Sequence, residues 1–125
     1  MPFVCPACSH HASLKIVLSI ELPPDSRSDE ITLQVVQCSD CAFAGIAVYE
    51  ESRRGRLDSE SLHHTGYYVN KNDLRELRKA IRSCPEPRNP RCQCPTHRTL
   101  GKTDASGRWD ALRHLEITEA FPLAT

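Results

Sequence analysis

Hydrophobic and polar residues alternate strictly over two stretches in the first third of the chain. In the first stretch, residues 14–22, the apolar side chains are Leu14, Ile16, Leu18, Ile20 and Leu22. In the second, residues 31–35, the alternation resumes after a polar, proline-bearing segment. A period of two predicts half-buried β-strands. We expect these two strands to pair antiparallel, with each apolar set on a single face, and residues 43–49 to form a third strand.

A helical period replaces this alternation further along the chain. Leu74, Leu77 and Ile81 follow i, i+3, i+7 spacing, which predicts a helix over residues 73–83 with one apolar face. Asn70, or the asparagine two residues later, is suited to cap its N-terminus. Prolines that follow the helix prevent it from continuing. The pattern therefore predicts one well-defined helix.

The remaining segments give weaker patterns. Residues 50–61 are charged and predict a connector, and residues 63–69 predict a turn followed by a short strand. Residues 109–115 predict a short second helix, and residues 117–125 predict a strand or an extended arm. The fold class that follows is α+β, with a small antiparallel sheet and a C-terminal helix.

Composition makes additional support for this fold necessary. The chain has 125 residues, of which 39% are hydrophobic and 6% aromatic, and a core this small needs stabilising cross-links. Seven cysteines are available. No apolar run approaches the roughly 20 residues that cross a bilayer, and no signal peptide precedes the first cysteines. We therefore expect no membrane partner, a cytoplasmic location, and cysteines that serve as metal ligands rather than disulfides.

Four of the cysteines form two Cys-x-x-Cys pairs that flank the predicted hairpin. These are Cys5, Cys8, Cys38 and Cys41. Two intervening residues let both sulfurs of a pair reach one ion at about 2.3 Å, and two pairs complete a tetrahedral shell. The spacing predicts a closed, structural metal site.

We call each Cys-x-x-Cys pair a knuckle. Two knuckles around a hairpin resemble the zinc-ribbon class over residues 3–50, and the first knuckle, Cys-Pro-x-Cys, is similar to that of prokaryotic CPXC-domain proteins. The resemblance implies a ribbon domain over residues 1–70 that holds Zn²⁺. The spacing is also similar to that of rubredoxins, which hold one iron. Here Ser9 and Ala42 replace the glycines of rubredoxin knuckles, and no aromatic residue lies between the pairs. Sulfur ligands alone fit either metal, and these differences favour zinc.

A second group of potential ligands lies in a proline-rich loop. Its members are Cys84, Cys92, Cys94 and His97. Three thiolates and one imidazole form a closed four-ligand shell. His64 or His114 is an alternative fourth ligand, and three reduced cysteines in a flexible loop are a further alternative. With both sites present, the chain is predicted to hold two zinc ions. Residues 71–125 then form a second unit held together by metal, or continue the first domain. No catalytic residue is predicted.

Charge is unevenly distributed, although the formal net charge is zero. Residues 1–51 contain two basic and seven acidic side chains, whereas residues 71–98 contain eight basic and three acidic ones. The basic residues of the predicted helix are candidate nucleic-acid contacts: Arg75, Arg78, Lys79 and Arg82. A solvated helix face is the alternative interpretation.

Three functions are compatible with these patterns. The first is a non-catalytic zinc protein that acts through protein–protein contact, as an interaction module or accessory subunit of a larger complex. The second is a nucleic-acid-binding zinc-ribbon protein, and the third is a rubredoxin-like electron carrier. The first fits the closed sites and the neutral net charge.

Overall fold

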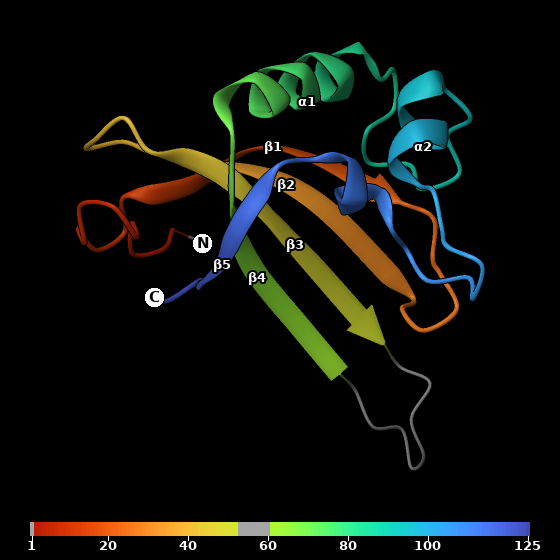
Figure 1. Ribbon diagram of the computed structural model, residues 1–125, viewed down its shortest axis with the longest axis horizontal. Coiled ribbons are helices and arrows are strands. Elements are labelled where there is room, and N and C mark those ends of the chain that lie inside the picture. Colours follow the sequence, from red (N-terminus) through yellow and green to blue (C-terminus); the bar gives the residue numbers. More distant parts are fainter. Residues whose placement is uncertain (1, 53–60) are drawn as a thin grey trace.

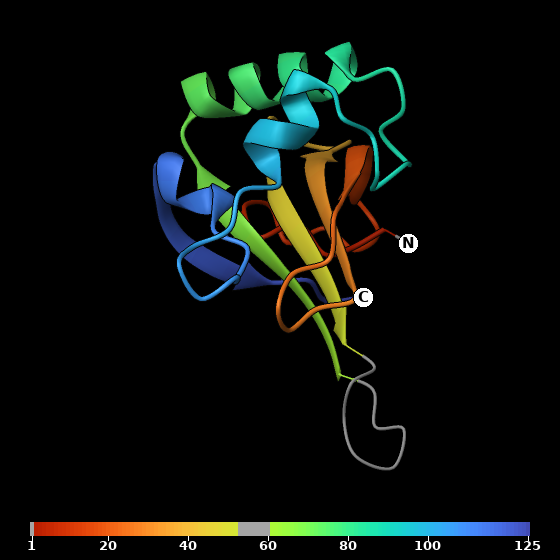
Figure 2. The same ribbon diagram turned by 90° about the vertical axis from the view of Figure 1, so that its right-hand side faces the viewer.

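The computed structural model describes residues 2–52 and 61–125. In chain order its elements are β1 (Leu14–Leu22), β2 (Glu30–Cys38), β3 (Ala44–Ser52), β4 (Ser61–Val69), α1 (Lys71–Ser83), α2 (Pro95–Leu100), the 3₁₀ turn η2 (Ala111–His114) and β5 (Ile117–Pro122) (Figure 1). The strands form one antiparallel sheet in sequence order. Both helices lie on the same side of this sheet (Figure 2). The arrangement is of the α+β type.

The strongest sequence patterns are confirmed. Strand β1 has the predicted bounds, and β2 contains the predicted second strand. Helix α1 begins two residues earlier than predicted, at Lys71, and buries the three predicted apolar residues. Asn70 is its N-cap, because its side-chain oxygen accepts a hydrogen bond from the backbone N–H of Asp73 at 2.8 Å.

The apolar residues of β1 do not share one face, so that prediction is wrong. Opposite β2 the register shifts by one residue: Ile16 pairs with Val36, and Leu18 pairs with Val35. Successive residues of β2 point to opposite faces of the sheet. The apolar residues of β1 up to Ile16 therefore pack on one face, and those from Leu18 onward pack on the other. A β-bulge between the two halves therefore lets one strand contribute to two cores.

These two cores lie on opposite faces of the sheet. The helix-side core consists of Ile20, Leu22, Ile31, Leu33, Val35, Ile46, Val48, Leu74, Leu77, Ile81 and Cys84. The knuckle-side core consists of Phe3, Cys5, Leu14, Val36, Cys38, Ala47 and Phe121. Each core thus contains at least one cysteine of the predicted metal sites, which places those cysteines against buried apolar side chains.

The middle of the sheet is more extensive than the sequence predicts. Strand β3 continues to Ser52 and β4 already begins at Ser61, so the predicted connector over residues 50–61 is wrong at both ends. Its central residues, 53–60, lie outside the described residues. The predicted turn within residues 63–69 is also absent from the described structure, because this segment belongs to β4 and pairs with β3 as far as Tyr67.

The C-terminal segment packs back onto the sheet instead of projecting as an arm. Strand β5 pairs with β4, where Phe121 lies opposite Gly66 and is 4% exposed. A Cβ atom at Gly66 would overlap the ring of Phe121, so this close approach requires glycine. The second helix predicted over residues 109–115 is a short 3₁₀ turn, and α2 is a helix that no sequence pattern predicted.

Among the described helices, none combines the length and hydrophobicity needed to cross a bilayer.

Candidate metal centres

The first cysteine cluster forms where two chain segments meet at one end of the sheet. The first knuckle precedes β1 and is held by an antiparallel bridge between Phe3 and Leu14. The second knuckle joins the end of β2 to β3. Leu14 is paired with Cys38 across β1 and β2, so the strand register itself brings the second knuckle beside the first. We call this cluster site 1.

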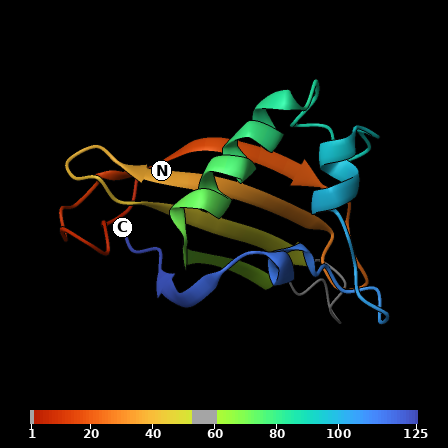
Figure 3. The ribbon, with the colours of Figure 1, turned by 45° about the horizontal axis from the view of Figure 1, so that its top comes forward.

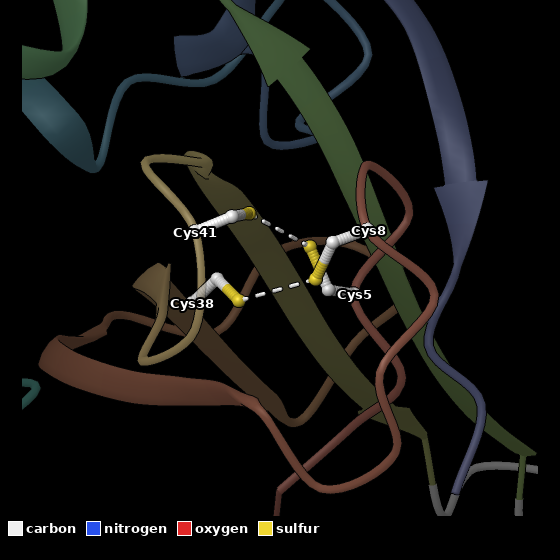
Figure 4. Close-up of side chains that lie close together, drawn as sticks. All are labelled: Cys5, Cys8, Cys38 and Cys41. Carbon is white, nitrogen blue, oxygen red and sulfur yellow. Dashed lines mark hydrogen bonds between the residues drawn. The ribbon is translucent and has the colours of Figure 1, made fainter.

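The four sulfurs of site 1 have the spacing of a tetrahedral metal site. Sγ of Cys5 lies 3.7 Å from Sγ of Cys41, and Sγ of Cys8 lies 3.7 Å from Sγ of Cys38 (Figure 4). All four sulfurs lie within 4.8 Å of one another. A tetrahedron with metal–sulfur bonds of about 2.3 Å has edges of about 3.8 Å. The residues therefore fit a metal ion bound by four cysteines.

Backbone amides point toward these sulfurs, as the knuckle spacing predicts. The N–H groups of Ala7, Asp40 and Phe43 donate to Sγ of Cys5, Cys38 and Cys41 at 3.4, 3.3 and 3.4 Å. Such hydrogen bonds stabilise negative charge on sulfur and orient the ligands. On the exposed side, Nδ1 of His10 lies 3.1 Å from a carboxylate oxygen of Asp40, which ties the two knuckles together.

The pKa values of Cys38 and Cys41 diverge because the two thiols differ in their hydrogen bonds and lie close to other thiols. A hydrogen bond with the Ser13 hydroxyl, 3.4 Å away, and the N–H of Asp40 outweigh burial and lower the pKa of Cys38 to about 6. The N–H of Phe43 favours the thiolate of Cys41, but burial and the neighbouring thiols raise its pKa to about 12. A thiolate at Cys38 therefore coexists with a protonated Cys41, and a metal ion must displace that proton.

The second cluster, which we call site 2, joins the two helices. Cys84 is the C-cap residue of α1, and Cys94 is the N-cap residue of α2. Sγ of Cys84 lies 3.9 Å from that of Cys92 and 3.5 Å from that of Cys94. Nδ1 of His97 lies 3.2 and 3.3 Å from the sulfurs of Cys84 and Cys94. All four ligand atoms lie within 4.8 Å, which fits a metal site of three cysteines and one histidine.

The imidazole of His97 is oriented for metal binding through Nδ1. Its Nε2 lies 3.0 Å from the backbone carbonyl oxygen of Glu21 in β1. A carbonyl only accepts hydrogen bonds, so Nε2 carries a proton, and in the neutral ring the Nδ1 lone pair then faces the sulfurs. The N–H of Glu21 in turn donates to the carbonyl oxygen of Pro87 at 2.7 Å. Site 2 is thus attached to the outer edge of β1.

The cysteines of site 2 also differ in pKa. Burial is the main reason that the pKa of Cys84 rises to about 11. Burial also opposes ionisation of Cys94, but hydrogen bonds from the backbone N–H of His97 and from neighbouring thiols help to lower its pKa to about 6. As the N-cap residue, Cys94 accepts the His97 N–H at 3.4 Å, a position that favours a thiolate.

The other candidate residues lie outside both clusters. His64 approaches Gln34, with Nε2 2.6 Å from the amide oxygen, and burial lowers its pKa. Neither His64 nor His114 belongs to either group of potential ligands found among the described residues. The candidate nucleic-acid contacts all lie on α1. Sequence reasoning missed Ser13 and the carbonyl of Glu21, whose roles depend on tertiary packing and leave no local pattern.

Comparison of the chain with protein-family models, with curated proteins and with solved structures finds no match. The geometry of the two clusters therefore carries the functional argument. What it defines is a class: a protein with two sets of Cys and His side chains, each arranged so that it could hold a metal ion.

Proposed function

We propose that this protein is a structural zinc protein that holds one Zn²⁺ in each site and acts as an interaction module or accessory subunit of a larger cytoplasmic complex. The observation that carries the proposal is the presence of two four-ligand shells with tetrahedral spacing, one at each end of β1. Such closed shells occur in structural zinc sites, whose metal contributes directly to folding.

The ligand chemistry supports zinc over other metals. A tetrahedral set of three thiolates and one imidazole is typical of structural zinc, and four thiolates suit zinc or iron. The knuckles and the antiparallel β1–β2–β3 meander also support a zinc-ribbon arrangement at site 1. One metal in both sites is the simplest assignment.

Both shells favour a structural role over a catalytic one. Each already supplies four protein ligands, which leaves no open position for a metal-bound water. Several of these ligands are deeply buried: Cys5 is 1% exposed, Cys38 3% and His97 2%. Substrates therefore have poor access to a bound ion. The ions would act by holding the surface of the molecule in one shape.

Metal content tests the proposal directly. Elemental analysis of the purified 125-residue chain, expressed without added metal, should give two zinc ions per chain. Cys38→Ser and Cys94→Ser should each remove one ion. One iron per chain would instead identify an electron carrier at site 1, and protein that folds and remains soluble with no bound metal would overturn the structural role.

A further inference from the structure

The cationic side chains of α1 gather along one flank of the helix. Successive residues of an α-helix are rotated by about 100°. Measured from the buried Leu74, all five basic residues fall within an arc of about 100°: Lys71, Arg75, Arg78, Lys79 and Arg82. Of the acidic residues, Asp73 lies on the opposite flank, whereas Glu76 lies beside the cationic arc, about 60° from Lys79. Segregation of this kind does not follow from a merely solvated helix face, on which both signs are commonly mixed.

Contacts at each flank show which way the helix faces. On the cationic flank, the guanidinium of Arg78 donates to the side-chain oxygen of Gln37 at 3.2 Å. Gln37 pairs with Lys15 of β1, so this flank faces the first two strands (Figure 3). On the acidic flank, the Asp73 carboxylate accepts the backbone N–H of Glu116 at 2.7 Å. The Asp73 carboxylate is therefore occupied by the C-terminal segment.

A further cation lies beside β1 on the site 2 loop. Arg88 lines a groove of 370 Å³ together with Pro87 and residues 16–19 of β1. The loop position is fixed by the hydrogen bond between Pro87 and Glu21. We define the cationic surface as Lys15, Lys71, Arg75, Arg78, Lys79, Arg82 and Arg88. It extends from the flank of α1 to the edge of β1.

Most of this positive charge has no negative partner. Lys79 lies 3.7 Å from Glu76, with both side chains about 70% exposed. The other six cations of the surface form no ion pair with any described residue. Lys71 and Arg75, and likewise Arg75 and Lys79, are like-charged i, i+4 neighbours, whose repulsion destabilises a helix. An anionic partner would remove this repulsion.

The composition of the surface indicates the kind of partner. Protein interfaces usually have an apolar or aromatic centre with charge at the rim. The large hydrophobic side chains most exposed on the described residues are Val17 and Leu62, and only Val17 borders this surface. Arginine forks match phosphate oxygens, and phosphate contacts need no apolar anchor.

We propose that the cationic surface binds the phosphate backbone of nucleic acid, without reading its sequence. The inference deepens the proposed function and rests on it, because the zinc ion of site 2 would hold the loop that positions Arg88. The charge arises from side chains alone, so binding should weaken steeply as salt rises.

Fluorescence anisotropy with a labelled single-stranded oligonucleotide tests the inference on the metal-loaded full chain. Each phosphate contact contributes roughly fivefold to affinity near 0.1 M salt. Arg75→Gln combined with Arg82→Gln should therefore weaken binding about 25-fold and reduce the salt slope by about 1.4. The matched control, Lys102→Gln with Arg113→Gln, removes the same charge outside the surface, in η2 and the loop that precedes it. It should change affinity less than about twofold.

Three results would overturn the inference: no binding of the oligonucleotide, equal losses in the two double variants, or equally tight, equally sensitive binding of polyglutamate. The last result would indicate an acidic protein partner. Zinc content is measured on each sample. Two zinc ions without nucleic-acid binding would refute this inference alone, whereas binding by a stably folded metal-free chain would refute only the structural zinc role.

Discussion

The two metal sites differ in how much the polypeptide itself contributes to their assembly. At site 1, the pairing of β1 with β2 and the bridge between Phe3 and Leu14 bring the knuckles together. At site 2, the ligands come from the ends of two helices and the loop between them, and reach the sheet through Glu21. Strand pairing therefore brings the ligands of site 1 together. At site 2 the loop has few apolar residues, so a bound metal would hold it in place where a hydrophobic core otherwise would.

The largest expected effect is the loss of site 1. Cys38 belongs to both the metal cluster and the knuckle-side core, so Cys38→Ser removes an ion and disturbs buried packing. We expect the free energy of unfolding to fall by on the order of 5 kcal/mol or more, because metal-binding free energy contributes to folding. Thermal denaturation with parallel zinc analysis measures this. A melting curve that matches the unmodified protein would refute the role of site 1 as a clamp.

Loss of site 2 should have a more local effect. In Cys94→Ser, we expect amide hydrogen exchange to accelerate across the loop after α1 and in α2, while β2 and β3 remain protected. Mass spectrometry of exchanged peptides provides the measurement. Uniform loss of protection in the sheet would show that the sheet depends on site 2 as much as on site 1, and would remove the contrast between them.

The sites should also respond differently to pH. Zinc binding at site 1 must displace protons from at least Cys8 and Cys41, whose pKa values are raised. At site 2 it must displace at least the proton of Cys84, whose pKa is about 11. Metal release takes up protons, so acid favours it. Affinity should fall by at least about 100-fold per pH unit at site 1 and at least about tenfold at site 2 near neutral pH.

Zinc release to a chromogenic chelator measures these slopes, with Cys94→Ser reporting on site 1 and Cys38→Ser on site 2 wherever that chain remains folded. Below about pH 6, Cys38 and Cys94 also take up protons, and both slopes should steepen further. A slope at site 2 steeper than that at site 1 would contradict this contrast between the two sites.

The smallest expected effect on stability comes from backbone strain beside site 1. The segment after the first knuckle contains Ser9 at φ 64° and Ala12 at φ 56°, in the left-handed region that favours glycine. No other non-glycine residue in the described ranges has a positive φ. Ala12→Gly should raise the free energy of unfolding by up to about 1 kcal/mol. Chemical denaturation measures it, and a clear loss of stability would contradict the strain.

Sequence patterns predicted the features that depend on local spacing. The alternation of residues 14–22 identified β1, and the spacing of Leu74, Leu77 and Ile81 identified α1. The close pairs of cysteines similarly pointed to the ligands that lie together in site 1. Each of these signals requires only neighbours in the chain, which is why the sequence was sufficient.

Features that depend on distant partners were missed or predicted in part. The bulge in β1 exists only relative to β2, so no pattern within β1 shows it. Strand β4 contains Gly66 and two adjacent histidines, a weak strand pattern that pairing with β3 and β5 overrides. Helix α2 begins with a proline at its first turn, a known start signal, but Cys94 is an uncommon cap residue.

The bulge near Val17 also restricts how the number of residues in β1 can change. The bulge reverses which residues of β1 point to which face of the sheet, so Leu14 can face site 1 while Ile20 faces the helices. Deletion of one residue there would restore a uniform phase and turn one half of β1 inside out. Between the first knuckle and Glu21, a change of chain length by two residues would therefore keep each half of β1 on its present face, whereas a change by one residue would not.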